Sequence, residues 1–216
     1  YSGLHVKLIG TDPGIYSELN GGTHLSVEDV AIMRAIPNML VIDAIDNTAL
    51  ENLTRLAMRD ERSAYIRVAR KFPRKVYGAD AKFELGKANT VREGSDMTII
   101  ASGLMVAWSL DAAEMLEKEG INVKVLDMHT IKPIDREAVI AAAKMGPVVT
   151  AENASIVGGL GSAVAEVMAE EGIATKFERV GIRDRYGVVG FLKDISEELE
   201  MTADDIAAAC RRVMGK

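Results

Sequence analysis

The residues best suited to chemistry lie between Asn20 and Met39, in the run NGGTHLSVEDVAIMRAIPNM. Two glycines precede His24 and a predicted helix follows it. Glycine lets a backbone approach a ligand closely, and a helix N-terminus favours anionic groups nearby. A lone histidine is more often structural, but this context favours an imidazole at the mouth of a strand-to-helix turn, where α/β proteins bind substrates. His24 is therefore the first candidate for contact with a substrate.

Arg70 is the second candidate, because it follows a predicted strand over Ala64–Val68. The fork of donors on a guanidinium group matches two phosphate oxygens at once. A surface ion pair with a carboxylate is an equally good interpretation of Arg70, and Arg67 is the alternate residue for an anion. The third candidate is the loop Gly10–Asn20, most of which falls in the predicted loop Thr11–Gly22 that is rich in Gly, Asp and Asn.

The remaining motifs carry less information about function. The run Gly158–Gly161 could hold an anion on backbone amides, but a tight strand-to-helix turn is the better interpretation. His129 follows a predicted strand, which favours a turn or interface role, and Cys210 has the pattern of a structural cysteine. The sequence contains no cysteine pair, HExxH, GxSxG or P-loop motif, so we expect this chain alone to bind no metal tightly.

The composition of the 216 residues is typical of a globular protein, with 48% hydrophobic and 27% charged residues. A net charge of −6 argues against nucleic-acid binding, which uses clustered basic residues. No apolar run reaches the roughly 18 residues that cross a bilayer. The single cysteine fits a reducing, cytoplasmic setting. Residue 1 is Tyr rather than Met, and a strand is predicted at Val6–Ile9, so we expect a first domain that is incomplete at its N-terminus.

Strands and helices alternate along the chain. Apolar runs predict strands over Val6–Ile9, Met39–Ile42, Ala64–Val68, Met97–Ala101, Val123–Met128, Pro147–Ala151 and Phe177–Val180. Helical patterns and end signals predict helices over Asn47–Arg59, Met105–Glu119, Arg136–Lys144, Gly161–Glu171 and Ala203–Met214, the last capped by Thr202 and Asp205. Ser26 and Asp29 form a capping-box pattern that opens a helix to about Ala35. A short strand is also expected at Lys82–Leu85.

Continuous apolar strands separated by helices imply parallel sheets that are covered on both faces. The predicted fold class is α/β, with two parallel-sheet three-layer domains, the first incomplete at its N-terminus. The expected division is a first domain over residues 1–75, a linker over 76–92, and a second domain over 93–216.

The chain resembles the transketolase family. The run from Gly21 to Met39 is similar to the GPTH-helix-RAIPNM segment of that family, and YIRVARK around Arg70 is similar to the end of a family strand. The resemblance implies part of a thiamine-pyrimidine-binding domain at residues 1–75, followed by a transketolase C-terminal domain. It also implies that His24 hydrogen-bonds a substrate oxygen and that Arg70 binds the phosphate group of a sugar phosphate.

Asp12 and Asn20 stand where the family often places a histidine for the phosphate and an acid for a sugar hydroxyl. The resemblance assigns both to the substrate-binding residues, although a carboxylate at Asp12 would repel phosphate while Asn20 could still bond a hydroxyl. The runs GTDPG and ELNGGTH, which contain these two residues, are more similar to the corresponding segment of transketolases that are split into two subunits. The Glu152-Asn153 pair falls in the C-terminal domain, which the resemblance makes a region of dimer contacts.

The implied reaction is transfer of a two-carbon ketol unit between sugar phosphates, as in the pentose phosphate pathway. The implied cofactor is thiamine diphosphate with Mg²⁺ or Ca²⁺, whose diphosphate and metal would be bound by an N-terminal partner subunit. We expect a homodimer through this chain. The glutamate and aromatic residues that hold the pyrimidine lie, in the family, before the strand at Val6–Ile9, so we expect the isolated chain to be inactive.

Three alternatives remain open from the sequence. The chain is also similar to 1-deoxyxylulose-5-phosphate synthase, which has a comparable GPTH motif. The β subunits of decarboxylating oxo-acid dehydrogenases share the architecture but fit the RAIPNM context less well. A non-catalytic dimerisation module is the third interpretation of the chain as it stands.

Overall fold

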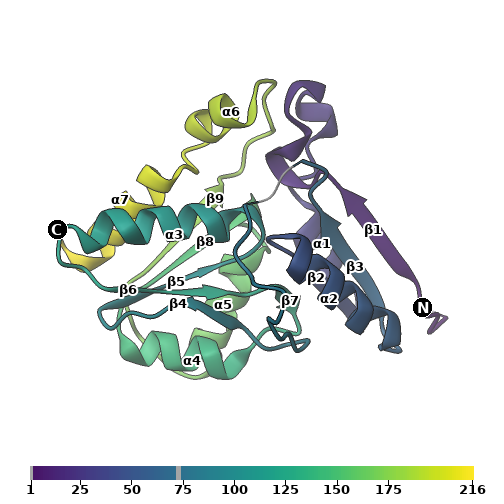
Figure 1. The fold of residues 1–216 in the computed structure, drawn as a ribbon, viewed down its shortest axis with the longest axis horizontal. Helices are drawn as coiled ribbons and strands as arrows, with labels where there is room; N and C mark the ends of the chain where they lie inside the picture. Colours follow the sequence, from purple (N-terminus) through teal and green to yellow (C-terminus); the bar gives the residue numbers. More distant parts are fainter. Residues whose placement is uncertain (1, 72–73) are drawn as a thin grey trace.

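The computed structural model describes residues 2–71 and 74–216 and contains two β-sheets (Figure 1). The first sheet has the order β1-β3-β2-β7, formed by Lys7–Thr11, Ser63–Val68, Met39–Asp43 and Thr130–Lys132. The second has the order β4-β6-β5-β8-β9, formed by Asn89–Arg92, Val123–Asp127, Met97–Ala101, Val148–Ser155 and Phe177–Ile182. In each sheet one edge strand, β7 or β4, is antiparallel to its neighbour and the other pairings are parallel.

Helices cover both faces of the second sheet. The helices of the whole chain are α1 (Asp29–Ala35), α2 (Asn47–Arg59), α3 (Leu104–Glu117), α4 (Arg136–Met145), α5 (Leu160–Glu170), α6 (Leu192–Glu198) and α7 (Ala203–Met214). In Figure 1, α3 and α7 lie together over one face of this sheet, and α4 and α5 lie together over the other. None of these helices is long and apolar enough to cross a membrane within the described ranges.

Strand β2 of the first sheet is likewise covered on both faces, with alternate residues pointing to opposite sides, whereas the edge strand β1 leaves Leu8 and Ile9 exposed. Along β2, Leu40 and Ile42 pack in the cluster that contains the apolar side of α2, whereas Val41 packs in the cluster that contains Val30 of α1. All five residues of β2 are buried. The fold class is confirmed as two mostly parallel sheets flanked by helices, with the antiparallel edges as the difference.

The elements with strong local signals were predicted well. Helix α2 has the predicted bounds, and helix α7 begins after Thr202 with the predicted capping box, in which Thr202 and Asp205 each accept a backbone N–H of the other residue. These signals lie within one turn of the helix end and do not depend on the rest of the fold. Helix α3 starts one residue earlier and ends two residues earlier than predicted, at Leu104 and Glu117.

Other predictions were wrong. Lys82–Leu85 is not a strand, and the strand of this region is β4, which begins at Asn89. Ser26 does not cap α1, because the carboxylate of Asp29 is turned inward to other partners. The expected loop Thr11–Gly22 contains a 3-10 helix, η1, over Gly14–Asn20. Strand β7 and helix α6 were not predicted at all.

Candidate functional site

The candidate residues lie where parallel strands β1 and β3 end. After Thr11 the chain turns at Asp12, which has a left-handed φ of 53°, and enters η1. A second 3-10 turn, η2, covers Gly22–His24. The backbone N–H of Asp12 donates to the carbonyl of Val68 at 2.9 Å, which ties this turn to the end of β3. Asp12 and Arg70 therefore lie next to each other where β1 and β3 end.

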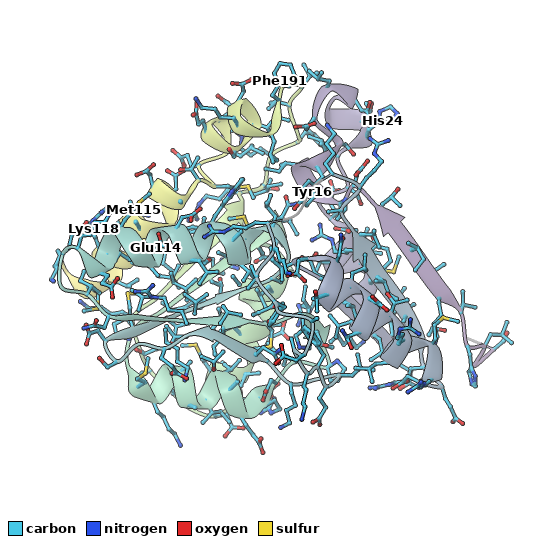
Figure 2. All side chains as sticks on the ribbon, in the orientation of Figure 1. Tyr16, His24, Glu114, Met115, Lys118 and Phe191 are labelled. Carbon is cyan, nitrogen blue, oxygen red and sulfur yellow. The ribbon has the colours of Figure 1, made fainter. Side chains whose placement is uncertain are left out.

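His24 is exposed, and Figure 2 shows it at the same end of the molecule as Phe191. Its Nδ1 lies 3.0 Å from the Thr23 hydroxyl. Position 22, two residues before His24, requires glycine because a Cβ there would stand 2.2 Å from the carbonyl oxygen of Gly187. The segment at Gly187 therefore crosses directly over the turn that presents the imidazole.

Asn20 is also exposed, at the end of η1. The turn before it is held from the second half of the chain, since Glu18 accepts the backbone N–H of Leu192 at 3.0 Å and forms an ion pair with Lys71. Figure 1 accordingly shows α6 beside η1. Glu18 has φ 45° and ψ −116°, a conformation that costs energy and that these contacts maintain.

Asp12 and Arg70 are in direct contact. The Nε of Arg70 lies 2.8 Å from Oδ2 of Asp12, and the backbone N–H of Arg70 donates to Oδ1 at 3.0 Å. The Asp12 side chain is 8% exposed and that of Arg70 is 64% exposed. The ion-pair interpretation of Arg70 is confirmed, and anion binding by the exposed side of its guanidinium stays a prediction.

Arg67, the alternate residue for an anion, is not available to a ligand. Its side chain is 1% exposed, with Nε 2.9 Å from Asp29, Nη1 2.8 Å from Asp43, and Nη2 2.8 Å from the carbonyl of Asn153. Burial lowers the pKa of Arg67, but the carboxylates of Asp43 and Asp29 outweigh it and raise the pKa above its usual value. Arg67 is a permanent buried cation that joins the two halves of the chain.

A second buried polar group lies beside this network. Tyr77 donates its hydroxyl to Asp127 at 2.8 Å, and burial raises the pKa of Asp127 to about 8. His129 is fully buried against the ring of Phe83, and burial lowers its pKa to about 4. Its carbonyl accepts the backbone N–H of Asp43 at 2.9 Å, which places His129 at the contact between the two halves of the chain.

The glycine-rich run Gly158–Gly161 binds an anion that belongs to the chain itself. The carboxylate of Glu152 accepts the backbone N–H groups of Leu160 and Gly161 at 2.6 and 2.8 Å, at the N-terminus of α5. Burial raises the pKa of Glu152 to about 7, and these two donors oppose that effect. The interpretation of this run as a structural turn is confirmed, and it is closed to an external phosphate.

The candidate site is a set of polar side chains rather than a metal centre. Across ranges 2–71 and 74–216 there is no group of His, Cys, Asp and Glu that could hold a metal ion. The aromatic ring contacts Tyr77–Phe83 and Phe83–His129 are edge-to-face, and Tyr77 and His129 are buried. The exposed side chains His24, Asn20 and Arg70 can orient a polar, anionic substrate.

Comparison with known proteins identifies the family of the chain. The family model described as transketolase, pyrimidine binding domain, matches residues 1–75, and the one described as transketolase, C-terminal domain, matches residues 86–206. The chain is 47% identical over 214 residues to the 6-deoxy-6-sulfo-D-fructose transketolase subunit SqwH of Clostridium sp. strain MSTE9, with 99% of this chain and 66% of that protein covered. It is 33% identical over 201 residues to 1-deoxy-D-xylulose-5-phosphate synthase of Heliobacterium modesticaldum, with 90% and 30% covered.

A solved structure agrees with these matches. The structure titled split gene transketolase, inactive β4 tetramer, superposes with a TM-score of 0.89 at 40% identity, covering 97% of this chain and 67% of that one. The chain spans 66% of the length of the Clostridium relative. The chain belongs to the transketolase family, and its sequence corresponds to the pyrimidine-binding and C-terminal domains of that family.

Proposed function

We propose that this chain is the C-terminal subunit of a split transketolase, which transfers a two-carbon ketol unit between sugar phosphates when assembled with an N-terminal subunit. One observation carries the proposal. Nearly the whole chain matches a protein named as a transketolase subunit, at 47% identity over 99% of its length. The split gene transketolase, at a TM-score of 0.89, supports the same assignment.

In this proposal three side chains orient the substrate. His24 hydrogen-bonds the reacting carbonyl or hydroxyl oxygen, Asn20 contacts a sugar hydroxyl, and the free side of Arg70 binds the terminal anion. The exposure of all three side chains supports these roles. Thiamine diphosphate, when bound in the assembly, supplies the carbanion chemistry, while protein groups orient the substrate.

The partner subunit has a defined task in the proposal. In the proposal the N-terminal subunit holds the diphosphate and its Mg²⁺ or Ca²⁺, as the resemblance to split transketolases implies. We further propose a homodimer through this chain, and a division into a pyrimidine-binding part at 1–75, a linker at 76–92 and a C-terminal domain at 93–216. Without the partner, the chain is inactive.

The proposal is tested with the complete protein assembled with its N-terminal subunit, thiamine diphosphate and Mg²⁺. We expect two-carbon transfer from fructose 6-phosphate to ribose 5-phosphate, measured as consumption of the donor. His24→Ala should lower kcat/KM about 100-fold, as loss of a donor to a developing oxyanion does. His5→Ala is the matched control, because His5 is also exposed but lies before β1.

Two other results would redirect the assignment. Consumption of pyruvate with glyceraldehyde 3-phosphate, and no ketol transfer, would favour the synthase activity named for the Heliobacterium relative. No activity at all, in an assembly that nevertheless forms, would favour a non-catalytic dimerisation module. A second candidate donor is 6-deoxy-6-sulfofructose, because the Clostridium relative carries that sugar in its name.

A further inference from the structure

We propose that Asp12 is a positioning residue for Arg70, and that its charge biases the anion-binding end of the substrate site toward monoanionic groups. The inference rests on the proposed function and deepens it. It replaces direct contact between Asp12 and the substrate with an action through the guanidinium of Arg70.

The geometry of the pair supports this role. Oδ2 of Asp12 lies 2.8 Å from Nε of Arg70, and Oδ1 accepts the backbone N–H of the same residue at 3.0 Å. One carboxylate therefore fixes both the start of the Arg70 side chain and its charged end. Such double fixing reduces the rotamer freedom that a substrate anion would otherwise have to restrict on binding.

The burial of the Asp12 side chain explains why its carboxylate forms an ion pair with Arg70. Its side chain is 8% exposed, and a buried carboxylate is costly without a cation or donors. The turn that carries it is fixed on several sides. The Asp12 backbone N–H donates to the carbonyl of Val68, its own carbonyl accepts the Ser17 hydroxyl at 3.1 Å, and Asn153 donates to the carbonyl of Pro13 at 3.1 Å.

Arg70 keeps donors for a ligand. Its side chain is 64% exposed, and among the described residues its Nη1 and Nη2 have no hydrogen-bond acceptor. The neighbouring cations are already paired, Lys71 with Glu18 and Arg74 with Asp111. Arg67 is buried and fully engaged.

The charges around Arg70 therefore cancel in pairs. A ligand anion at the Nη side meets the positive guanidinium first and the negative Asp12 behind it. Attraction and repulsion both scale with the ligand charge, so Asp12 repels a phosphate dianion about twice as strongly as a sulfonate monoanion at equal distance. The pair retains directional donors for tetrahedral oxygens but offers little net charge, which reduces the electrostatic advantage of a dianion over a monoanion.

The test compares two donors that differ at this end, fructose 6-phosphate and 6-deoxy-6-sulfofructose, with the assembled enzyme at pH 7.5. We expect Asp12→Asn to raise the phosphate-to-sulfonate ratio of kcat/KM about threefold, the scale of one partly screened charge. Asparagine tolerates the left-handed φ of 53° at this position. Asp12→Gly serves the same purpose if the Asn variant fails to fold, because glycine adopts this φ without strain.

Two controls separate charge from position. Asp12→Glu keeps the charge but moves it, so it should lower kcat/KM for both donors and leave their ratio unchanged. Asp204→Asn removes an exposed carboxylate on α7 and should change neither value.

The outcomes distinguish the two proposals. If the wild-type assembly transfers a ketol unit and the neutral Asp12 variants leave the phosphate-to-sulfonate ratio of kcat/KM unchanged, this inference alone is overturned. A wild-type assembly that transfers no ketol unit from either donor overturns the proposed function, and this inference falls with it.

Discussion

Asp127 is a fully buried carboxyl group whose Oδ1 has no hydrogen-bond partner among the described residues. Burial raises its pKa from 3.8 to about 8, so the group is protonated in the fold at neutral pH. For an acid whose folded pKa is raised, stability is fully present below the unfolded pKa and is lost as pH rises through the folded pKa. The contribution of Asp127 should therefore decline between about pH 4 and pH 8.

Asp127→Asn keeps the shape and removes this titration. Relative to wild type, its free energy of unfolding should rise by on the order of 2 kcal/mol between pH 5 and pH 8. Urea unfolding at the two pH values measures the difference. Glu114→Gln, an exposed change on α3, should show no such trend, and an Asn variant that follows the wild-type pH profile would disprove the assignment.

Among single residues, the sequence predicted position along the chain better than it predicted side-chain partners. Arg70 lies two residues after β3, as predicted, whereas Asn20 and His24 lie in the 3-10 turns η1 and η2 between β1 and α1. The partners of Arg67 and Asp12 could not be predicted, because they are far away along the chain. Arg67 meets Asp29, 38 residues before it, and Asp12 meets Arg70, 58 residues after it.

Asp46 shows how a helix cap can also fix a connection. Its Oδ1 accepts the backbone N–H of Ala49 at 2.8 Å and so caps α2. Its Oδ2 accepts the backbone N–H groups of Val76 and Tyr77, both at 2.8 Å. Removing the carboxylate leaves three donors unsatisfied, and Tyr77 is itself buried.

We therefore expect Asp46→Ala to lower the free energy of unfolding by about 3 kcal/mol, beyond the roughly 1 kcal/mol of an ordinary cap. Thr202→Ala is the matched control, since the Thr202 cap of α7 bonds only within its own helix end. Urea unfolding of both variants makes the comparison. Equal losses would mean that the contacts to Val76 and Tyr77 add nothing.

At the scale of elements, local signals sufficed for long helices and failed for short segments. The period and ends of α2 are visible in its own residues. Strand β7 has only three residues, Thr130–Lys132, and exists because β2 lies beside it in an antiparallel register. Helix α6 is similar, since its first residue is held by Glu18, which precedes it by 174 residues.

The molecule as a whole has a core that crosses the boundary between its two sheets. One apolar cluster contains Leu40 and Ile42 of β2 together with Ile99 of β5, and the other joins Val41 to Ile100. Strand β7 leaves the second half of the chain to complete the first sheet. We infer that the two sheets unfold together, although the sequence favoured two domains with a linker between them.

Arg67→Met tests this coupling, because Arg67 lies in the first sheet and the single tryptophan, Trp108, reports from α3 above the second. The change leaves Asp29 and Asp43 buried without their cation, which should cost about 3 kcal/mol. In one cooperative unit, the urea transition of Trp108 fluorescence shifts by the full amount, in step with far-UV circular dichroism. Arg55→Met removes an exposed ion pair on α2 and should cost no more than about 0.5 kcal/mol. If the Arg67 variant lost circular dichroism early while the Trp108 transition stayed in place, the two sheets would be independent units.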